Sequence, residues 1–321
     1  MGIVKTESTY SSTSKEDINI YYTWWVDDQK KPIGVIQLTH GWGEYIDRYE
    51  DLAEYLAGHG YVVCGQDHLA HGLTAGLDYN GIYPGDANKA MIEDMHELYK
   101  IMHGKYKKLP YFLYGHSMGS MMTRAYIAKY GKDLSGAIVC GTRYMPWVAS
   151  LLNLPINVIY GLFGSYKRSM KKAAKKAEKH PKSTQWGTKK KANSIDMLMN
   201  GWLSFDQQNI VNYINDPYCA AGMDISMLKM YEVTTRAGAP FWTHRVPKEL
   251  PIFIISGQQD MAGEFGIGPE LTYQQLKSSG RNVTKKLYHH AKHEIHNESA
   301  IKDEVYADIL NFIDQNNPKV K

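Results

Sequence analysis

Cysteine is scarce in this chain of 321 residues, which contains only Cys64, Cys140 and Cys219. An odd set of three cysteines cannot form the disulfide framework that stabilises small secreted domains. The N-terminus also lacks the basic residues followed by an apolar run that mark a secretory signal. Both absences favour a reducing cytoplasm as the location of the protein.

Long uninterrupted apolar runs are also missing. Residues 144–166 contain no charged side chain, but Pro146, Asn153, Pro155, Asn157 and Gly161 are among the residues that interrupt the run. A membrane-spanning helix requires about 20 predominantly apolar residues. The segment therefore predicts short apolar helices rather than a membrane span.

The chain has no large excess of charge, since 37 Lys and Arg oppose 33 Asp and Glu, a net charge of +4. This balance argues against a nucleic-acid-binding protein. Residues 167–191 nevertheless hold eleven Lys or Arg against the single acid Glu178, so this segment carries +10 and the remainder −6. We hypothesise that it makes peripheral contact with an anionic membrane. The alternative is a solvated charged helix, which the sequence does not exclude.

Short apolar runs alternate with helical patterns along most of the chain, which indicates a mainly parallel α/β sheet flanked by helices. The expected strands are 18–26 (as an edge strand), 33–38, 61–64, 111–114, 136–140, 251–255 and 283–288. The alternation stops between about 143 and 245. We expect a flexible tail over 1–15, a core over 16–142 and 246–321, and a helical cap inserted over 143–245.

A nucleophile motif lies at Gly115-His116-Ser117-Met118-Gly119, where an apolar strand runs into a helix. In a G-x-S-x-G turn between strand and helix, the tight bend exposes the serine at the carboxyl end of the strand. The N-terminus of the following helix favours developing negative charge. Ser117 is therefore the predicted nucleophile.

A serine hydroxyl needs a base to become a nucleophile. In enzymes with a serine turn between strand and helix, an acid and then a histidine follow the serine along the chain. Asp260 comes just after the strand at 251–255 and is the predicted acid. His290 and His293 both follow the last strand, and local sequence does not choose between them. Four histidines occur within 289–296, but no metal-binding pattern accompanies them, so we expect neither a metal nor another cofactor.

A glycine-rich turn, His40-Gly41-Trp42-Gly43-Glu44, follows the strand at 33–38. Such a turn can direct a backbone N–H at an oxyanion, and the residue after the nucleophile supplies a second one. The predicted oxyanion donors are the backbone N–H groups of Trp42 and Met118.

Five motifs in this order resemble the monoacylglycerol lipase and lysophospholipase branch of the α/β-hydrolase family. They are H-G-x-G-E with Arg48-Tyr49, D-x-x-x-H-G at 67–72, G-H-S-M-G at 115–119, S-G-x-x-D at 256–260 and K-H-E at 292–294. The resemblance implies an α/β-hydrolase fold and His293 as the base. The sequence departs from the family pattern at Trp42, where a small residue is usual, and at Met261-Ala262, where proline-valine is common.

The resemblance also suggests substrate contacts. It implies that Glu44 and Arg48 organise the glycerol end of the site, although a structural salt bridge explains this pair equally well. His116, Trp147 and Leu151 are further expected substrate-binding residues, the last two as part of an apolar channel in the cap.

The sequence thus predicts a serine hydrolase of lipid esters, with monoacylglycerols or lysophospholipids as substrates. One alternative is a broad short-chain carboxylesterase or a serine peptidase that uses the same three residues. Another is a non-catalytic lipid-binding protein on a hydrolase fold.

Overall fold

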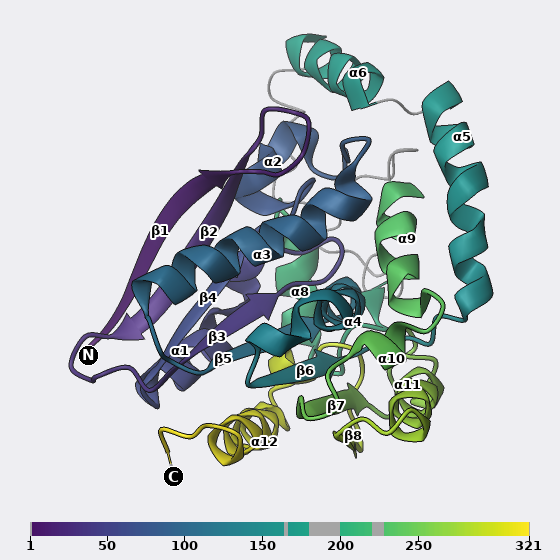
Figure 1. Cartoon of the computed structure of the whole chain (residues 1–321). Helices are drawn as coiled ribbons and strands as arrows, with labels where there is room; N and C mark the ends of the chain where they lie inside the picture. Colours follow the sequence, from purple (N-terminus) through teal and green to yellow (C-terminus); the bar gives the residue numbers. More distant parts are fainter. Residues whose placement is uncertain (1, 164–165, 180–199, 220–227, 321) are drawn as a thin grey trace.

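A computed structural model describes residues 2–163, 166–179, 200–219 and 228–320. Its centre is one eight-stranded sheet in the order β1-β2-β4-β3-β5-β6-β7-β8, which Figure 1 shows as a twisted layer. The strands are β1 (Ile3–Ser11), β2 (Asn19–Asp27), β3 (Gly34–Thr39), β4 (Tyr61–Gln66), β5 (Tyr111–His116), β6 (Gly136–Cys140), β7 (Ile252–Gly257) and β8 (Val283–Tyr288).

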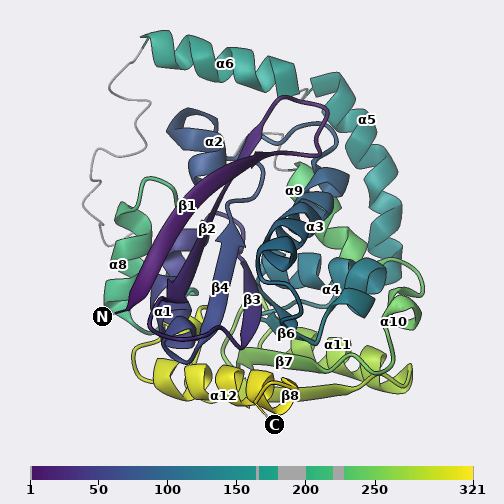
Figure 2. The same cartoon turned by 60° about the vertical axis from the view of Figure 1, so that its left-hand side comes forward.

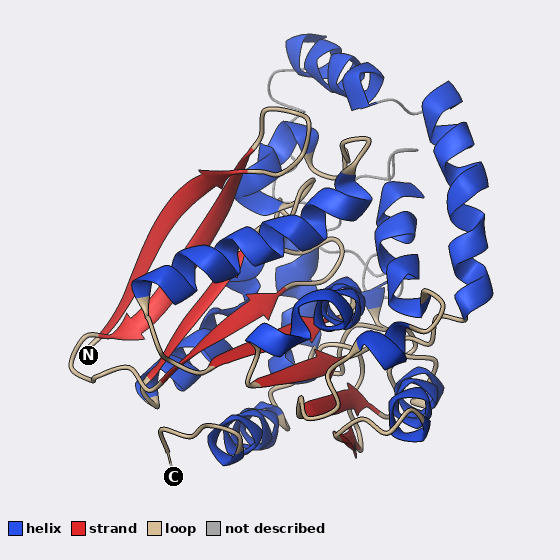
Figure 3. Ribbon diagram, in the orientation of Figure 1, coloured by secondary structure: helices blue, strands red, loops and turns tan. Residues whose placement is uncertain are grey.

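Strands β3 to β8 are parallel to one another, while β1 and β2 are antiparallel additions at one edge. Helices cover both faces of the sheet (Figure 3). Those outside the 143–245 segment are α1 (Glu50–Gly58), α2 (Gly72–Tyr79), α3 (Ala87–Lys105), α4 (Met118–Tyr130), α11 (Ile267–Ser278) and α12 (Lys302–Gln315), with short 3₁₀ turns η1 (Ile46–Tyr49), η2 (Gly131–Asp133) and η6 (Ile295–Asn297).

The inner parallel strands are apolar on both faces because each face packs against helices. On β3, Ile36 and Leu38 join the core cluster formed with α1 and α12, whereas Val35 joins a cluster formed with α3. Successive side chains of a strand point to opposite faces, so burial on both sides requires a continuous apolar run. This is why the sequence predicted the inner strands well, and the α/β-hydrolase architecture is confirmed.

The N-terminal segment differs from its prediction. Residues 3–11 form β1, which pairs with β2 along its whole length, so the expected flexible tail over 1–15 is wrong. Strand β2 consequently lies between β1 and β4 and is not the edge strand that the sequence predicted. The segment is rich in Ser and Thr because an edge strand with exposed or half-buried side chains needs no apolar run.

Buried Asp94 on α3 explains how the chain continues beyond β1. Its carboxylate accepts the Ser12 hydroxyl at 2.7 Å, and the Thr13 N–H and hydroxyl at 2.7 and 2.8 Å. Sequence analysis missed these contacts because they join residues about eighty positions apart.

The chain between β6 and β7 contains helices and no strand in its described parts. They are η3 (Trp147–Leu152), α5 (Asn153–Phe163), α6 (Tyr166–Lys179), α8 (Gln207–Asn215), α9 (Leu228–Thr235), η5 (Arg236–Gly238) and α10 (Trp242–Arg245). Figure 2 shows α5 and α6 on the outside of the molecule. The predicted short apolar helices over 144–166 are confirmed, and none of the helices described has the length and apolar character needed to cross a bilayer. The cap boundaries at 143 and 245 stay a prediction.

Arg124 of α4 contacts both ends of this insertion. The side chain is fully buried, and its guanidinium donates to the carbonyl oxygens of Arg143 and Ala237, each at 2.9 Å. It also lies 4.7 Å from the ring centroid of Trp242. Burial lowers the pKa of Arg124 to about 9. The points where the chain leaves and re-enters the core are thus bonded to one side chain.

We predict that Asp94→Ala destabilises the fold by about 1–3 kcal/mol, because the hydrogen bonds that join residues 12 and 13 to α3 are lost. Burial outweighs these hydrogen bonds and raises the pKa of Asp94 to about 6, so the stability that the residue provides falls as pH rises through that value, and the loss should be measured by urea unfolding near pH 5. Asp86→Ala is the matched control, since the less buried Asp86 accepts from Ser14 and Lys15 of the same segment. Equal losses in the two variants would contradict the prediction.

Candidate active site

The turn at Ser117 joins β5 to α4 and holds the serine in an unusual backbone conformation. Ser117 has φ 54° and ψ −119°, a region that costs a non-glycine residue about 1–3 kcal/mol. Glycine is required on both sides: a Cβ on Gly115 would lie 2.4 Å from the carbonyl oxygen of Gly119, and one on Gly119 would lie 2.1 Å from that of Thr39. The Ser117 N–H donates to the Cys140 carbonyl at 3.0 Å, which ties the turn to β6. The serine remains partly exposed.

Asp260 follows β7 and His293 follows β8, and their side chains meet at the same edge of the sheet as Ser117. His293 Nδ1 lies 2.9 Å from Oδ1 of Asp260. The Gly263 N–H and the Ser256 hydroxyl donate to the same carboxylate at 2.9 and 3.2 Å. His290, the other candidate base, has an exposed side chain. The structure therefore pairs Asp260 with His293.

The charges of this pair support each other. Burial alone would raise the pKa of the Asp260 carboxyl, but the charge and hydrogen bond of His293 lower it below its ordinary value. Burial also opposes protonation of His293, yet Asp260 outweighs that effect and raises the pKa of the imidazole, with smaller contributions from Glu294 and Glu44. An imidazole held in this way has the proton affinity that a general base needs.

The loop after β3 lies directly against Ser117. A Cβ on Gly41 would lie 3.0 Å from Cβ of Ser117 and 2.5 Å from Oε1 of Glu44, so the close approach requires glycine. The Gly41 N–H donates to Glu44 Oε1 at 2.6 Å. Trp42 is the next residue, and Met118 begins α4 directly after the serine. The two predicted oxyanion donors thus border Ser117, and their use as donors stays a prediction.

The side chain of Trp42 fills space beside these donors. The indole is partly buried and packs against the core cluster that contains Met118, Leu69 and Tyr83. Trp42 therefore packs in the same cluster as Met118, the residue that follows Ser117. Its effect on an acyl chain stays a prediction.

Arg48 joins two buried carboxylates from distant parts of the chain. It donates to Glu44 Oε2 at 3.1 Å and to both carboxylate oxygens of Glu294, at 2.6 and 2.8 Å. The Tyr49 hydroxyl donates to Glu44 Oε1 at 2.8 Å. The Glu44 and Arg48 side chains are only 3% and 8% exposed. These contacts support the structural salt bridge for this pair, and contact with a substrate by either residue stays a prediction.

His116 links this network to the candidate base. Its Nδ1 lies 3.1 Å from Glu44 Oε1 and its Nε2 lies 3.1 Å from the carbonyl oxygen of His293. The side chain is buried. Both ring nitrogens therefore contact protein groups, which supports a positioning role rather than the expected substrate contact.

Two residues of the insertion reach the site and were missed by the sequence analysis. Asn209 on α8 accepts from Arg48 at 3.1 Å and donates to Glu294 at 2.8 Å. The Trp202 ring lies 5.1 Å from the His293 ring, measured between centroids. No local motif marks either residue, because their partners lie far away in the sequence.

Trp147 and Leu151, expected to line an apolar channel, have side chains of which 56% and 64% are exposed. Trp147 instead borders a surface pocket of about 510 Å³ whose other walls include Phe241, Trp242 and Gln275. Neither Ser117 nor His293 is among the residues that line this pocket. The described structure therefore gives no support to these two expected substrate contacts.

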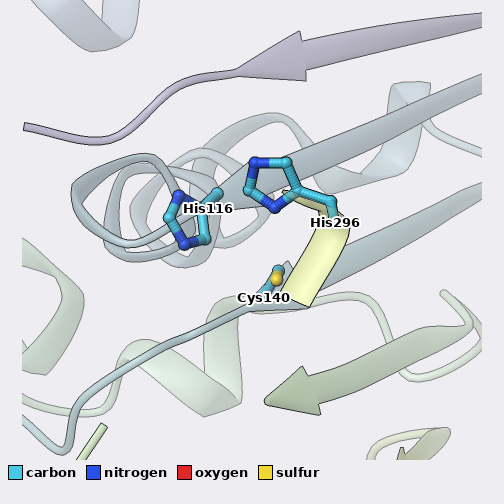
Figure 4. A group of neighbouring side chains, drawn as sticks. All are labelled: His116, Cys140 and His296. Atoms are coloured by element: carbon cyan, nitrogen blue, oxygen red, sulfur yellow. The ribbon is translucent and has the colours of Figure 1, made fainter. Parts of the chain in front are cut away.

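A cluster of His116, Cys140 and His296 has the residue types of a metal site (Figure 4). Burial raises the pKa of the Cys140 thiol, so it stays protonated. Burial also lowers the pKa of His296 to about 3, and its ring stacks on Tyr49 with centroids 4.6 Å apart. Since both nitrogens of His116 are engaged as well, the cluster is best explained as polar packing beneath the site.

Comparisons with known proteins identify relatives over most of the chain. The family model for serine aminopeptidase, S33 matches residues 30–300. Among curated proteins, a monoacylglycerol lipase of Mycolicibacterium smegmatis is 30% identical over 139 residues, which are 43% of this chain and 48% of that protein. A monoglyceride lipase of Homo sapiens is 23% identical over 298 residues, 88% of this chain and 83% of that protein. The match thus spans about half the length of the bacterial relative.

Solved structures show the same architecture. A thermostable carboxyl esterase from Bacillus coagulans, in complex with glycerol, is 30% identical with a TM-score of 0.79, and the match covers 97% of this chain and 98% of that one. A soluble variant of the Saccharomyces cerevisiae monoglyceride lipase, with a substrate analog, has a TM-score of 0.69 at 19% identity, with coverage of 98% and 95%. The latter likeness concerns the fold alone.

We predict that Arg48→Met destabilises the fold by about 3–5 kcal/mol near neutral pH, because two buried carboxylates lose their counter-ion. Lys302→Met is the matched control: it removes an exposed pair with Asp51 and should cost less than about 1 kcal/mol. Urea unfolding of both variants gives the comparison.

The loss of stability in Arg48→Met should depend on pH and should be largest near neutral pH. In the native chain Arg48 and His116 hold the pKa values of Glu294 and Glu44 below their ordinary range despite burial. The stability that the two ionised carboxylates provide is therefore present above pH ~4.3 and is lost as pH falls through the lowered pKa values. Without Arg48, burial raises these pKa values, and protonation at lower pH relieves the unpaired charge. The deficit of Arg48→Met should therefore shrink between about pH 7.5 and 5, and a deficit that grows would contradict this account.

Proposed function

The chain belongs to the serine aminopeptidase S33 family, and we propose that it is a serine hydrolase of lipid esters, with monoacylglycerols and lysophospholipids as its substrate class. The observation that carries the proposal is the pairing of Asp260 with His293 at the sheet edge where the strained turn presents Ser117. Relatives described as monoacylglycerol and monoglyceride lipases support monoacylglycerols, and lysophospholipids stay the alternative within this class.

In the proposed mechanism, Ser117 attacks the ester carbonyl carbon. The hydroxyl O–H bond breaks as its proton moves to His293 Nε2, and the new C–O bond leaves negative charge on the carbonyl oxygen. The Trp42 and Met118 N–H groups stabilise that oxyanion. Asp260 keeps Nδ1 protonated and stabilises the imidazolium.

Collapse of the intermediate breaks the ester bond, and His293 returns the proton to the leaving alcohol, which is glycerol for a monoacylglycerol and the glycerophosphodiester for a lysophospholipid. Water then enters, gives one proton to His293 and attacks the acyl-enzyme, which releases the fatty acid and restores the Ser117 hydroxyl. Each step balances with protein groups and water, so the mechanism requires no cofactor.

We assign the helical insertion over 143–245 as a cap on this site. The Trp202 and Asn209 contacts with His293, Arg48 and Glu294 support the assignment. The three buried cysteine thiols, none of which forms a disulfide, are consistent with the expected cytoplasmic location.

We predict that a fluorophosphonate labels the native protein and does not label Ser117→Ala, because only an activated serine reacts. Hydrolysis of monoacylglycerol should fall by about 10⁴-fold or more in the same variant. Ser120→Ala is a matched control: this buried serine donates only to the backbone carbonyl of Ser117 and does not contact the reacting hydroxyl in any hydrogen bond of the described structure, so labelling should remain.

A substrate series separates the alternatives. Long-chain monoacylglycerols and lysophospholipids should be preferred to short soluble esters and to aminoacyl amides. A preference for short esters would favour a broad carboxylesterase, and a preference for amides would favour the peptidase that the family description suggests. Native protein that resists labelling would favour the non-catalytic lipid-binding protein.

We further propose that α5 and α6 form a surface that contacts anionic membranes. On α6, Lys171, Lys172 and Lys175 are exposed, and on the neighbouring α5 the exposed apolar side chains are Val158, Ile159, Leu162 and Phe163. Apolar residues beside a basic helix match a bilayer with acidic head groups. Residues 180–191 of the basic segment lie outside the described residues.

We predict that the protein sediments with acidic liposomes more than with neutral ones. Replacing Lys171, Lys172 and Lys175 with Gln should weaken binding by up to about a hundredfold, since each basic residue near acidic lipid contributes about 1 kcal/mol. The matched control replaces three exposed lysines elsewhere, Lys107, Lys132 and Lys248, and should bind normally. Equal binding to both kinds of liposome, or none, would overturn the membrane proposal while leaving the hydrolase proposal intact.

A further inference from the structure

Trp202 lies against the imidazole of the candidate base. The two rings have centroids 5.1 Å apart and planes inclined by 44°. Trp202 belongs to the insertion, in the segment 200–206 that leads into α8, whereas His293 belongs to the loop after β8. The indole is partly buried and His293 is only 2% exposed. The contact therefore joins the insertion to the reacting histidine itself.

Hydrogen bonds between the residues beside these rings fix the relative position of the rings. Gly201 and Leu203, the neighbours of Trp202, accept hydrogen bonds from Lys292 and Glu294, the neighbours of His293. The Lys292 ammonium donates to the Gly201 carbonyl at 2.6 Å, and the Glu294 N–H donates to the Leu203 carbonyl at 2.9 Å. Because each flank of Trp202 is bonded to one flank of His293, the two rings are held in register.

Buried Glu298 fixes the next part of the same segment. Its carboxylate accepts the Ser204 hydroxyl at 2.8 Å and the N–H groups of Phe205 and Asp206 at 2.9 and 3.2 Å. It also accepts the N–H of Lys292 at 3.2 Å. Glu298 thus joins residues 204–206 to the loop that carries His293. Hydrogen bonds, as well as the packing of Trp202, hold this segment in place.

The chemistry of His293 gives the contact a consequence. In the proposed reaction the imidazole becomes a cation, and an aromatic ring attracts a cation that lies over its face within about 6 Å of the ring centroid. The His293 ring meets the distance condition at 5.1 Å. The other ionisable groups around the imidazole are Asp260, Glu294 and Glu44, which favour the cation, and His116, whose ring centroid is 4.6 Å away. Among the described residues, Trp202 is an uncharged aromatic neighbour of the imidazole that can act on the cation.

We propose that Trp202 is a positioning residue for the reaction, which orients the His293 ring and stabilises its imidazolium form. The proposal rests on the proposed function, because it assigns a purpose to the imidazolium that forms during acyl transfer. It makes a residue of the insertion part of the proton-transfer apparatus, so the insertion does more than cover the substrate.

The test compares Trp202→Leu with Trp202→Phe, since both keep an apolar side chain and only phenylalanine keeps an aromatic face. Histidine labelled with ¹³C is titrated by NMR, and the His293 signal is assigned by its absence in His293→Gln. We expect Trp202→Leu to lower the pKa of His293 by about half a unit, and Trp202→Phe to retain most of the native value. Phe205→Leu is the matched control, because Phe205 is an aromatic residue of the same segment that packs on Lys292 instead.

Kinetics supply a second readout. In Trp202→Leu the plateau value of kcat should fall about two- to fivefold with little change in KM, and the acidic limb of the pH profile should move to lower pH. An unchanged or higher pKa of His293 in Trp202→Leu, or an equal shift in Phe205→Leu, would overturn the inference. Absence of fluorophosphonate labelling in the native protein would instead overturn the proposed function, and the NMR titration would still report on the ring contact.

Discussion

The guanidinium of Arg48 lies between two buried carboxylates, and the arrangement of the site depends on it. Removing three charges from water costs several kcal/mol per ion unless each charge is paired and hydrogen-bonded. Arg48 meets that condition through its contacts with Glu44 and Glu294. Glu44 holds the loop beside Ser117, and Glu294 adjoins His293, so one cation sets the spacing between the predicted oxyanion loop and the predicted base.

The same cation also reaches the insertion. Asn209 shares the Arg48 and Glu294 hydrogen bonds, and the Tyr213 ring lies 4.9 Å from the guanidinium. The loop after β3, the loop after β8 and helix α8 are therefore joined through a few polar side chains, of which Arg48, Glu44 and Glu294 are buried. Partial loss of a buried network is costly, because each remaining group is left without a partner.

Most of the core could be predicted from local pattern. An inner parallel strand has to be apolar on both faces, and a serine turn of this kind requires glycine at positions 115 and 119, so the sequence carries both signals directly. The choice of His293 over His290 needed either the family resemblance or the pairing with Asp260, because both histidines follow the same strand. Strand β1 escaped prediction because its side chains are exposed or only half-buried, so no apolar run marks it in the sequence. Trp202 and Asn209 escaped it because their partners come from loops of the core, and the exposure of Trp147 and Leu151 depends on how the insertion packs.

Arg124 attaches two distant points of the insertion to helix α4. Because one buried side chain bonds the carbonyl groups of Arg143 and Ala237, the outgoing and returning segments of the chain are both attached to α4 at the same residue. One side chain therefore fixes these two points of the chain relative to each other, whatever the number of residues between them. The insertion is bonded to the core a second time through residues 201–209, which contact the loop that carries His293. A change in the length of the insertion can accordingly be absorbed between these two attachments without moving the sheet edge that carries the serine and histidine.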